Sequence, residues 1–309
     1  MANFYMMVGL PGSGKTTFAH NIEKGAVVIS SDTIRKELWG SEEKQGDNKI
    51  IFEELEKRVM ENLVADKSVV YDATNIKAKK RKAFLDKLRK IPNVNTVCML
   101  MSVPYEECLE RNVARGRVVP EEVIKRMYMN FEIPQTREGW CQINIVQPKL
   151  EGYNIFKEMD RLCKINQDNS HHIYTIGNHC IMAEKYLTEH YSTKLSIDRL
   201  TKLQLAAFMH DIGKDFCKTF VNTLGEETKE AHYYFHENVS AYQSLLYLTK
   251  DKSLKTVEDI LYVADLIQLH MRPFSLNTEK AIQNLQNKIG IEEYNDLMIL
   301  NDCDIHASK

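Results

Sequence analysis

Hydrophobic and polar positions alternate in two different ways along the 309-residue chain. In the first half, short continuous apolar runs rich in β-branched residues are separated by amphipathic stretches. Five such runs occur, at 4–10, 26–30, 68–74, 95–103 and 143–146. Between the second and third runs, apolar residues recur at the four-residue spacing of one helix face: Ile51, Leu55, Val59 and Leu63. This pattern predicts a parallel α/β sheet covered by helices on both faces.

The second half lacks such runs, and its pattern is helical throughout. We predict helices at 172–190, 199–211, 233–249, 256–270, 278–289 and 292–305. The change of pattern falls within 150–169. We therefore expect two domains, an α/β domain at 1–152 and an all-α domain at 153–309.

Composition excludes several classes of protein. A content of 43% hydrophobic and 27% charged residues is typical of globular chains, not of disordered or collagen-like ones. The net charge of −2 excludes a strongly basic nucleic-acid-binding protein. No apolar run reaches the roughly 20 residues that span a bilayer, and the N-terminus does not resemble a signal peptide. The seven cysteines form no CxxC pair, which favours reduced thiols and a cytoplasmic location.

The two halves differ in charge and in histidine content. Residues 1–150 carry a net charge of +4, and residues 151–309 carry −6. His20 is the only histidine of the first half, and the other nine lie between His171 and His306. This asymmetry predicts two sites of different chemistry, one that handles phosphates with cations and one that holds metal.

The first candidate site is a phosphate loop. Residues 9–16 read GLPGSGKT, which satisfies GxxxxGK[ST] between a strand and a helix. Lys15 is expected to reach the β- and γ-phosphates of an NTP, and Thr16 to place its hydroxyl on Mg²⁺. The alternative is a glycine turn with an incidental lysine. The predicted NTP-binding residues are Gly12, Ser13, Gly14, Lys15, Thr16, Thr17, Arg111 and Arg115.

Candidate acceptor residues follow the next two strands. Asp32 comes directly after the second strand, where a carboxylate can accept the proton of an attacking hydroxyl. Arg35 lies one helical turn further and suits an anion on the acceptor. The alternative is that Ser31 or Asp32 caps the helix. After the third strand, Asp72 is a candidate partner of the Mg²⁺ site, and Thr74 and Asn75 are expected to face the crevice.

Two further segments of the first half are rich in cations. Residues 76–82 read IKAKKRK, which indicates either a solvated helix face or a guide for a polyanion. Arg111, Arg115 and Arg117 stand near a glycine and a proline, a composition typical of a mobile arginine lid over a phosphate site. The alternative for Arg111 is a helix-surface ion pair with Glu107.

The segments GLPGSGKTT, SDTIR, VVYDATN and RNVARG…VP…RMY resemble the kinase domain of polynucleotide 5′-hydroxyl kinases, which heal broken nucleic-acid ends. The resemblance covers about the first 150 residues. It implies that Lys15 and Thr16 bind the donor phosphates and that Asp32 is the general base. It also implies that Arg35 binds the acceptor's adjacent phosphate, that Arg111 and Arg115 belong to a lid, and that Asp72 supports the site. Other P-loop phosphotransferases share such motifs, so a small-molecule acceptor remains open.

The second half contains candidate metal ligands. His210 and Asp211 stand together at the end of an apolar helix, His179 precedes them, and His236, His270 and Asp304 follow. Imidazole and carboxylate suit divalent metals. The alternative for each histidine is a structural role within its helix, and we retain that interpretation for His20, His190 and His306. The half contains no DxDxT motif, so any phosphatase activity needs different chemistry.

The order H…HD…H…H…D, in the segments SHHIYTIGNH, MHDIGK, HYYFHENVSA and LHMRP, is similar to the HD phosphohydrolase superfamily. These segments are particularly similar to the phosphodiesterase/phosphatase domains attached to some tRNA nucleotidyltransferases. The resemblance implies a metal on His179, His210, Asp211 and Asp304. It also implies a second metal on His236 and His270, bridged by Asp211. Asp302 competes with Asp304, and the implied phosphate contacts are Lys214, His232 and Arg272.

Together these features predict a bifunctional end-healing enzyme. Its kinase would phosphorylate a 5′-OH with ATP or another NTP and Mg²⁺. Its HD domain would use one or two ions of Mn, Ni, Co, Fe, Zn or Mg to remove a 3′-phosphate or open a 2′,3′-cyclic phosphate. The expected partners are RNA or DNA ends and a nucleic-acid ligase, without a membrane. The alternatives are a small-molecule kinase fused to an HD nucleotidase, and an NTP-binding regulatory module with a structural or signalling HD half.

Overall fold

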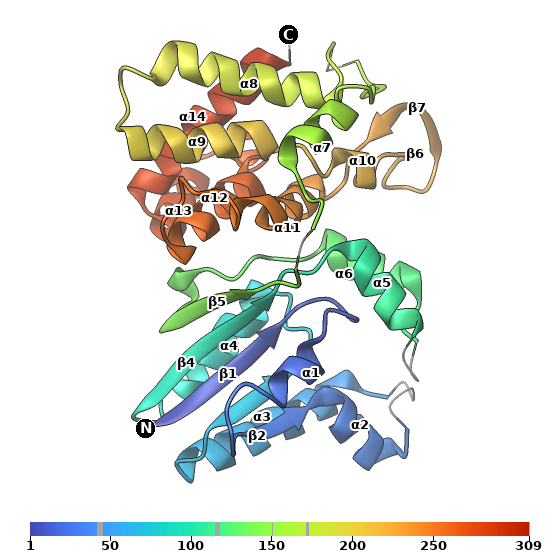
Figure 1. The fold of residues 1–309 in the computed structure, drawn as a ribbon, viewed down its shortest axis with the longest axis vertical. Helices are drawn as coiled ribbons and strands as arrows, with labels where there is room; N and C mark the ends of the chain where they lie inside the picture. The colour runs from blue at the N-terminus through green and yellow to red at the C-terminus, as the bar shows by residue number, and fades with distance from the viewer. Residues whose placement is uncertain (42–45, 115–117, 150, 171–172, 309) are drawn as a thin grey trace. The chain divides into compact units, whose positions relative to one another are not determined.

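The computed structural model describes residues 1–41, 46–114, 118–149, 151–170 and 173–308 (Figure 1). It divides into two compact units. The N-terminal unit comprises Met1–Tyr128 and Pro134–Lys149, and the C-terminal unit comprises Met129–Ile133 and Leu150–Lys309. Each unit is described below by itself.

The N-terminal unit contains the predicted parallel sheet. Its strand order is β2-β3-β1-β4-β5, and every neighbouring pair is parallel. The strands are β1 (Ala2–Val8), β2 (Val27–Ser30), β3 (Val69–Asp72), β4 (Val94–Met101) and β5 (Gln142–Val146). All four residues of β3 are buried, which explains why this strand reads as a continuous apolar run.

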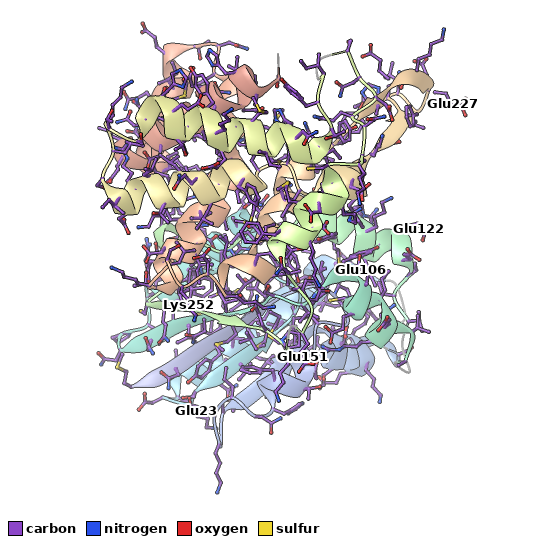
Figure 2. The ribbon with its side chains drawn as sticks, turned by 45° about the horizontal axis from the view of Figure 1, so that its top comes forward. Glu23, Glu106, Glu122, Glu151, Glu227 and Lys252 are labelled. Atoms are coloured by element: carbon purple, nitrogen blue, oxygen red, sulfur yellow. The ribbon has the colours of Figure 1, made fainter. Side chains whose placement is uncertain are left out.

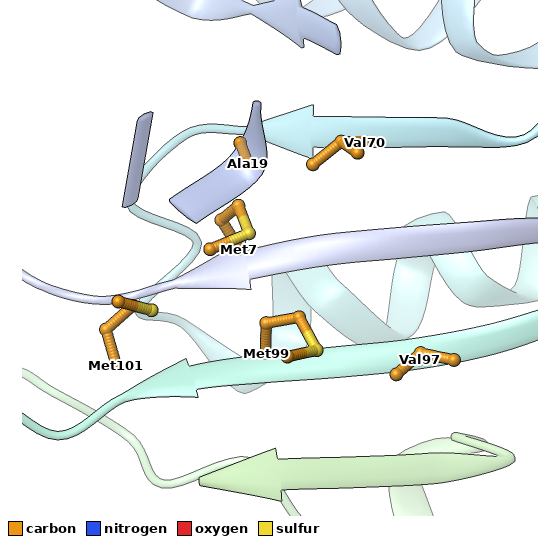
Figure 3. Close-up of a cluster of buried hydrophobic side chains, with 6 residues drawn as sticks. All are labelled: Met7, Ala19, Val70, Val97, Met99 and Met101. Carbon is orange, nitrogen blue, oxygen red and sulfur yellow. The ribbon is translucent and has the colours of Figure 1, made fainter. Parts of the chain in front are cut away.

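Helices flank the strands in sequence. They are α1 (Lys15–Ala19), α2 (Ser31–Trp39), α3 (Asn48–Val64), α4 (Ala78–Leu88), α5 (Tyr105–Val113) and α6 (Glu121–Met129), with a short 3-10 helix η1 at Thr136–Glu138. The predicted apolar face of α3 is buried at all four positions. Figure 3 shows one side of the sheet core, where strand side chains pack with one residue of α1: Met7, Val70, Val97, Met99, Met101 and Ala19.

The C-terminal unit is mainly helical. Its helices are α7 (Ile155–Leu162), α8 (Ile176–Tyr191), α9 (Ile197–Met209), α10 (Lys214–Cys217), α11 (His236–Leu248), α12 (Val257–Leu269), η2 (Pro273–Ser275), α13 (Glu279–Ile289) and α14 (Ile291–Ala307). The helix expected from residue 172 begins only at Ile176. Its start is set by Thr175, whose hydroxyl accepts a hydrogen bond from the Asn178 backbone N–H.

The expectation that this half is all-α is wrong in one segment. Strands β6 (Thr219–Val221) and β7 (Glu227–His232) form an antiparallel hairpin. Glu227 lies at the outer end of this hairpin in Figure 2. The strands are short and mostly exposed. Their sequences therefore contain neither a continuous apolar run nor a regular alternation of apolar and polar residues.

Met129–Ile133 belongs to the C-terminal unit, although it lies well before residue 150. The buried Phe131 ring packs edge-on against Tyr242 at a centroid distance of 4.8 Å. Gln268 donates to the Phe131 carbonyl at 2.8 Å and accepts from the Ile133 N–H at 3.0 Å. The sequence pattern did not separate this segment from its surroundings.

Two general features bear on the expectations above. All seven cysteines lie in the described residues and are free thiols. Over the same residues, no helix combines the length and the apolar character needed to cross a bilayer.

Candidate phosphate loop and candidate metal centre

The phosphate loop joins β1 to α1 and requires its glycines. Gly12 and Gly14 have φ values of 82° and 85°, in the left-handed region that favours glycine. A Cβ atom at Gly12 would lie 2.1 Å from the Cys108 carbonyl oxygen. The loop therefore packs directly on α5, and a side chain at Gly12 would displace it.

The polar side chains of the loop converge as the motif requires. Lys15 is buried, and its ammonium group donates to the Leu10 carbonyl at 2.7 Å. The Thr16 hydroxyl donates to an Asp72 carboxylate oxygen at 2.7 Å. Because β1 and β3 are adjacent and parallel, their carboxyl ends bring these two residues together. A hydroxyl and a carboxylate at the end of a phosphate loop fit Mg²⁺, which prefers oxygen ligands.

Asp32 and Arg35 lie together at the start of α2. An Asp32 carboxylate oxygen lies 2.9 Å from Arg35 Nη1. The helix is capped by Ser30, whose hydroxyl accepts from the Asp32 backbone N–H at 3.2 Å. The alternative interpretation, in which Ser31 or Asp32 caps the helix, is therefore wrong, because Ser30, the last residue of β2, is the cap. The Asp32 side chain is consequently not required for capping.

Thr74 and Asn75 hold the ends of two strands together. The Thr74 carbonyl accepts from the Gly9 N–H at 3.0 Å, and the Asn75 amide donates to the Met7 carbonyl at 2.8 Å. Asn75 has a φ of 47°, which asparagine tolerates better than most residues. The side-chain amide of Asn75 thus contributes to the fold, and an acceptor-binding role for Thr74 and Asn75 stays a prediction.

Arg81 differs from the other cations of the 76–82 segment because it is buried. Its guanidinium donates to both carboxylate oxygens of Glu138, at 2.8 and 2.6 Å, and to the Asn75 carbonyl at 2.9 Å. Trp140 donates to the same carboxylate at 3.2 Å. Arg81 therefore stabilises the loop that follows β3 from inside the unit. It is neither part of a solvated helix face nor a guide for a polyanion.

Arg111 is the described member of the predicted lid. It forms the helix-surface ion pair with Glu107 that we had considered as an alternative. It also lies near the phosphate loop, because a Cβ atom at Gly14 would be 3.7 Å from Arg111 Nη1. Arg115 and Arg117 lie outside the described residues. The buried Asn112, which the sequence did not single out, bonds through its amide to both backbone groups of Val119.

The C-terminal unit brings six candidate ligands together, and all six are buried. They come from α8, the turn after α9, the start of α11, the end of α12 and α14: His179, His210, Asp211, His236, His270 and Asp304. Two groups of possible ligand atoms share Asp211, one with His179 and His210 and the other with His236 and His270. His179 Nε2 lies 3.1 Å from Asp304 Oδ1 and 3.3 Å from Asp211 Oδ2. On the other side, Asp211 Oδ1 lies 3.1 Å from His236 Nε2.

Each of the four imidazoles is oriented by a backbone carbonyl. The Nδ1 atoms of His179, His210, His236 and His270 lie 3.2, 2.8, 2.7 and 2.7 Å from carbonyl oxygens. Because a carbonyl only accepts, each Nδ1 carries the proton, and the Nε2 of a neutral ring presents a lone pair. The Nε2 atoms nevertheless face each other in pairs, at 3.1 Å in both His179–His210 and His236–His270. Facing lone pairs repel unless a proton or a cation lies between them.

The carboxylates of the cluster complete a donor set that fits a divalent cation. Asp211 Oδ1 is buried without a hydrogen-bond donor. Burial raises the pKa of Asp211, but Lys214 and His210 outweigh it and hold the pKa well below its usual range. Burial likewise opposes ionisation of Asp304, yet hydrogen bonds from His179 and His210 hold its pKa well below the ordinary value. Both carboxyl groups are therefore anionic, as ligands for a divalent ion must be.

The histidine pairs are not equivalent electrostatically. Burial lowers the pKa of His210, but the Asp211 carboxylate outweighs it and raises the pKa well above the ordinary value. For His270, burial lowers the pKa, although the nearby Asp211 carboxylate opposes this shift. The His179–His210 pair, which lies nearer to Asp304, thus experiences a greater negative charge than the His236–His270 pair.

The three predicted phosphate contacts of this half, Lys214, His232 and Arg272, differ in their surroundings. Lys214 Nζ lies 2.7 Å from Asp211 Oδ2 and donates to Gln167 at 2.8 Å. His232 lies on β7 and bonds to Thr228, and Arg272 is an exposed residue two positions after His270. Gln167 was missed, because an isolated glutamine in a junction segment carries no sequence signal.

Asp302 accepts a hydrogen bond from the Tyr191 hydroxyl at 2.7 Å. It also pairs with His306 at 3.3 Å. Asp304, two residues after Asp302 on α14, is the carboxylate that reaches the imidazoles.

Fold and loop define the N-terminal unit as a P-loop phosphotransferase domain, and comparison with known proteins refines this class. Residues 4–134 match the family described as an AAA domain. An L-seryl-tRNA(Sec) kinase from Methanococcus maripaludis is 28% identical over 178 residues, which cover 53% of this chain and 66% of that protein. The chain thus matches just under two thirds of this relative. The N-terminal unit is therefore a P-loop domain similar to kinases, and such kinases use an NTP and Mg²⁺.

Solved structures show weaker likeness. A chain of the Pnkp1/Rnl/Hen1 RNA repair complex matches with a TM-score of 0.37 and 22% identity, over 42% of this chain and 43% of that one. A gluconokinase from Sinorhizobium meliloti matches with a TM-score of 0.34 and 21% identity, over 48% and 83%. Because both TM-scores are below 0.5, neither likeness supports an argument about the substrate of this chain.

Proposed function

We propose that this chain heals nucleic-acid ends with two activities, a 5′-hydroxyl kinase and an HD-type phosphohydrolase acting on 3′ ends. The observation that carries the second activity is the set of four buried imidazoles. Their protonated Nδ1 atoms bond to carbonyls, and their Nε2 atoms converge on Asp211. A kinase alone does not need such a centre, and a phosphohydrolase working on the same broken strand accounts for both.

The kinase step transfers the γ-phosphoryl group of ATP or another NTP. The 5′-hydroxyl oxygen forms a bond to the γ-phosphorus, the bond to the β–γ bridging oxygen breaks, and the nucleoside diphosphate leaves. Asp32 accepts the hydroxyl proton, and Arg35 binds the phosphate next to the acceptor hydroxyl. Lys15 turns from the Leu10 carbonyl to the donor phosphates. Thr16 and Asp72 would hold Mg²⁺, which neutralises charge on those phosphates.

The phosphohydrolase step uses the C-terminal unit. His179, His210, Asp211 and Asp304 would hold one divalent ion, and His236 and His270 a second one that shares Asp211. Such ions supply Lewis acidity toward the phosphoryl group and activate water. Lys214, whose Nζ lies 2.7 Å from Asp211 Oδ2, would donate to a phosphate oxygen. Arg272 and His232 are the proposed outer phosphate contacts. The metals that suit this donor set are Mn, Ni, Co, Fe, Zn and Mg.

The proposed substrates are RNA or DNA ends, and the products suit a nucleic-acid ligase. The second candidate for the kinase is phosphorylation of the serine hydroxyl on a charged tRNA. The observation favouring it is the 28% identity to the seryl-tRNA kinase. Both acceptors combine a hydroxyl with nearby nucleic-acid phosphates, so the same Arg35 contact serves either one.

One assay separates these proposals. Radiolabelled ATP is offered with 5′-OH RNA, 5′-OH DNA, seryl-tRNA, nucleosides and gluconate, and Lys15→Ala serves as the inactive control. In parallel, RNA with a 3′-phosphate or a 2′,3′-cyclic phosphate and free nucleotides are offered with each metal. We expect transfer to 5′-OH oligonucleotides and release of 3′-phosphate. Transfer to nucleosides or gluconate alone, with hydrolysis of free nucleotides alone, would refute end healing.

A further inference from the structure

We propose that Phe235 is the base-stacking residue of a subsite that holds the terminal nucleotide of a polynucleotide beside the imidazole centre. The inference rests on the proposed function of the C-terminal unit. Three observations carry it: the backbone conformation of Phe235, the exposure of its ring, and its place next to His236.

The backbone at Phe235 is a poor place for a large side chain. Its φ of 65° and ψ of 19° lie in the left-handed region, where a bulky residue is an outlier. The conformation serves the start of α11, because the Phe235 carbonyl accepts from the N–H groups of Asn238 and Val239 at 3.1 and 3.3 Å. Glycine or asparagine would adopt this conformation with less strain.

Burial does not compensate for the strain, because Phe235 remains 47% exposed. Because its backbone is strained and its ring is half-exposed, Phe235 stabilises the fold less than glycine or asparagine would at this position. Strained positions with poor structural justification cluster at functional sites. The ring therefore requires an explanation outside the folded chain.

Phe235 directly precedes His236, whose Nε2 meets that of His270 at 3.1 Å. Met271 directly follows His270 and is also exposed, at 39%. All four imidazoles are buried, so the exposed side chains nearest to them in the sequence are those of Phe235 and Met271. These two residues, which directly adjoin His236 and His270, are the candidate apolar rim of the centre.

The occupant that fits this rim is a nucleobase. An unstacked base presents a flat π-face that stacks on aromatic side chains without regard to its charge or sequence. The net charge of −6 in residues 151–309 disfavours an extended phosphate-binding track. One stacked base next to the terminal phosphate provides affinity that needs no such track.

The test compares three variants of the full chain. Phe235→Asn removes the ring and suits the left-handed backbone, Phe235→Leu keeps apolar bulk without a π-face, and Phe235→Tyr keeps the ring. Phe220→Asn is the matched control, since Phe220 on β6 has a similar exposure of 43%. The substrates are a 3′-phosphorylated oligonucleotide and p-nitrophenyl phosphate, which carries no base. A terminal 2-aminopurine reports stacking directly, because its fluorescence is quenched by an adjacent ring.

We expect Phe235→Asn and Phe235→Leu to raise the KM for the oligonucleotide about 10-fold, the effect of losing one base–aromatic stack. Both should lose the 2-aminopurine quenching and keep p-nitrophenyl phosphate hydrolysis, whereas Phe235→Tyr and Phe220→Asn should behave as wild type. Equal losses on both substrates would indicate a structural role and overturn the inference, as would an unchanged KM in Phe235→Leu. If the wild-type protein hydrolyses p-nitrophenyl phosphate but no polynucleotide end, the proposed function itself fails, and the subsite with it.

Discussion

Replacement of Arg81 by methionine tests whether the loop after β3 depends on a buried ion pair. The side chains of Arg81 and Glu138 are 0% and 7% exposed and share two hydrogen bonds. The variant leaves the Glu138 carboxylate buried, with only neutral donors such as Trp140. Loss of one partner from a buried pair costs about 3–5 kcal/mol. For a unit of this size, that corresponds to a fall in Tm of roughly 6–20 °C.

The assay uses the natural tryptophans. Trp39 and Trp140 are the two tryptophans of the sequence, and both belong to the N-terminal unit. Tryptophan fluorescence during heating therefore reports unfolding of that unit in the intact chain. Arg89→Met is the matched control, because Arg89 pairs with Asp86 at an exposed site, where an ion pair contributes about 0–1 kcal/mol.

The double variant Arg81→Met with Glu138→Gln should recover part of the loss, because no unpaired charge then remains. Weaker ATP binding by Arg81→Met is also expected, since Arg81 supports the Asn75 carbonyl and Asn75 bonds to the strand that leads into the phosphate loop. If Arg81→Met is no less stable than Arg89→Met, the reasoning about the buried pair is refuted.

Three further predictions concern catalysis, metal and pH. Lys15→Ala and Asp32→Ala should each reduce kinase turnover at least about 100-fold. ATP binding measured by calorimetry should persist in Asp32→Ala. Near-normal turnover in that variant would exclude Asp32 as the general base. Asp211→Ala should lose bound metal by elemental analysis and lose phosphohydrolase activity, but keep kinase activity; loss of both activities in a folded protein would contradict two separate sites. Burial opposes ionisation of Asp259, but its hydrogen bond from Lys202 at 2.6 Å lowers its pKa. Its stabilising contribution is therefore present above the ordinary pKa and lost as the pH falls through the lowered one. Urea unfolding of Asp259→Asn should lack this acid dependence.

The sequence predicted the sheet and the cluster of candidate metal ligands for a shared reason. Buried parallel strands are continuous apolar runs, and candidate ligands such as His210 and His270 stand at the ends of apolar helices. Both signals lie within a few neighbouring residues. The roles assigned to these residues remain predictions, whereas their convergence in space is a feature of the structure.

Features that depend on distant partners left no such signal. In the sequence, Arg81 is one of five cations within residues 76–82. Its burial depends on the ion pair with Glu138, which lies far along the chain. Phe131 is buried by Tyr242 of the other half. The β6–β7 hairpin is too short and too exposed to interrupt the helical pattern. Such long-range pairings are properties of the folded chain and cannot be derived from local periodicity.

The excursion of Met129–Ile133 has a topological consequence. The chain passes between its two units at residues 128–129, 133–134 and 149–150. A protease that cuts near residue 150 would therefore leave two fragments still joined, because Phe131 on the first fragment stays packed against Tyr242 on the second. In evolutionary terms, a recombination joint near residue 150 would separate Phe131 from the Tyr242 ring against which it packs.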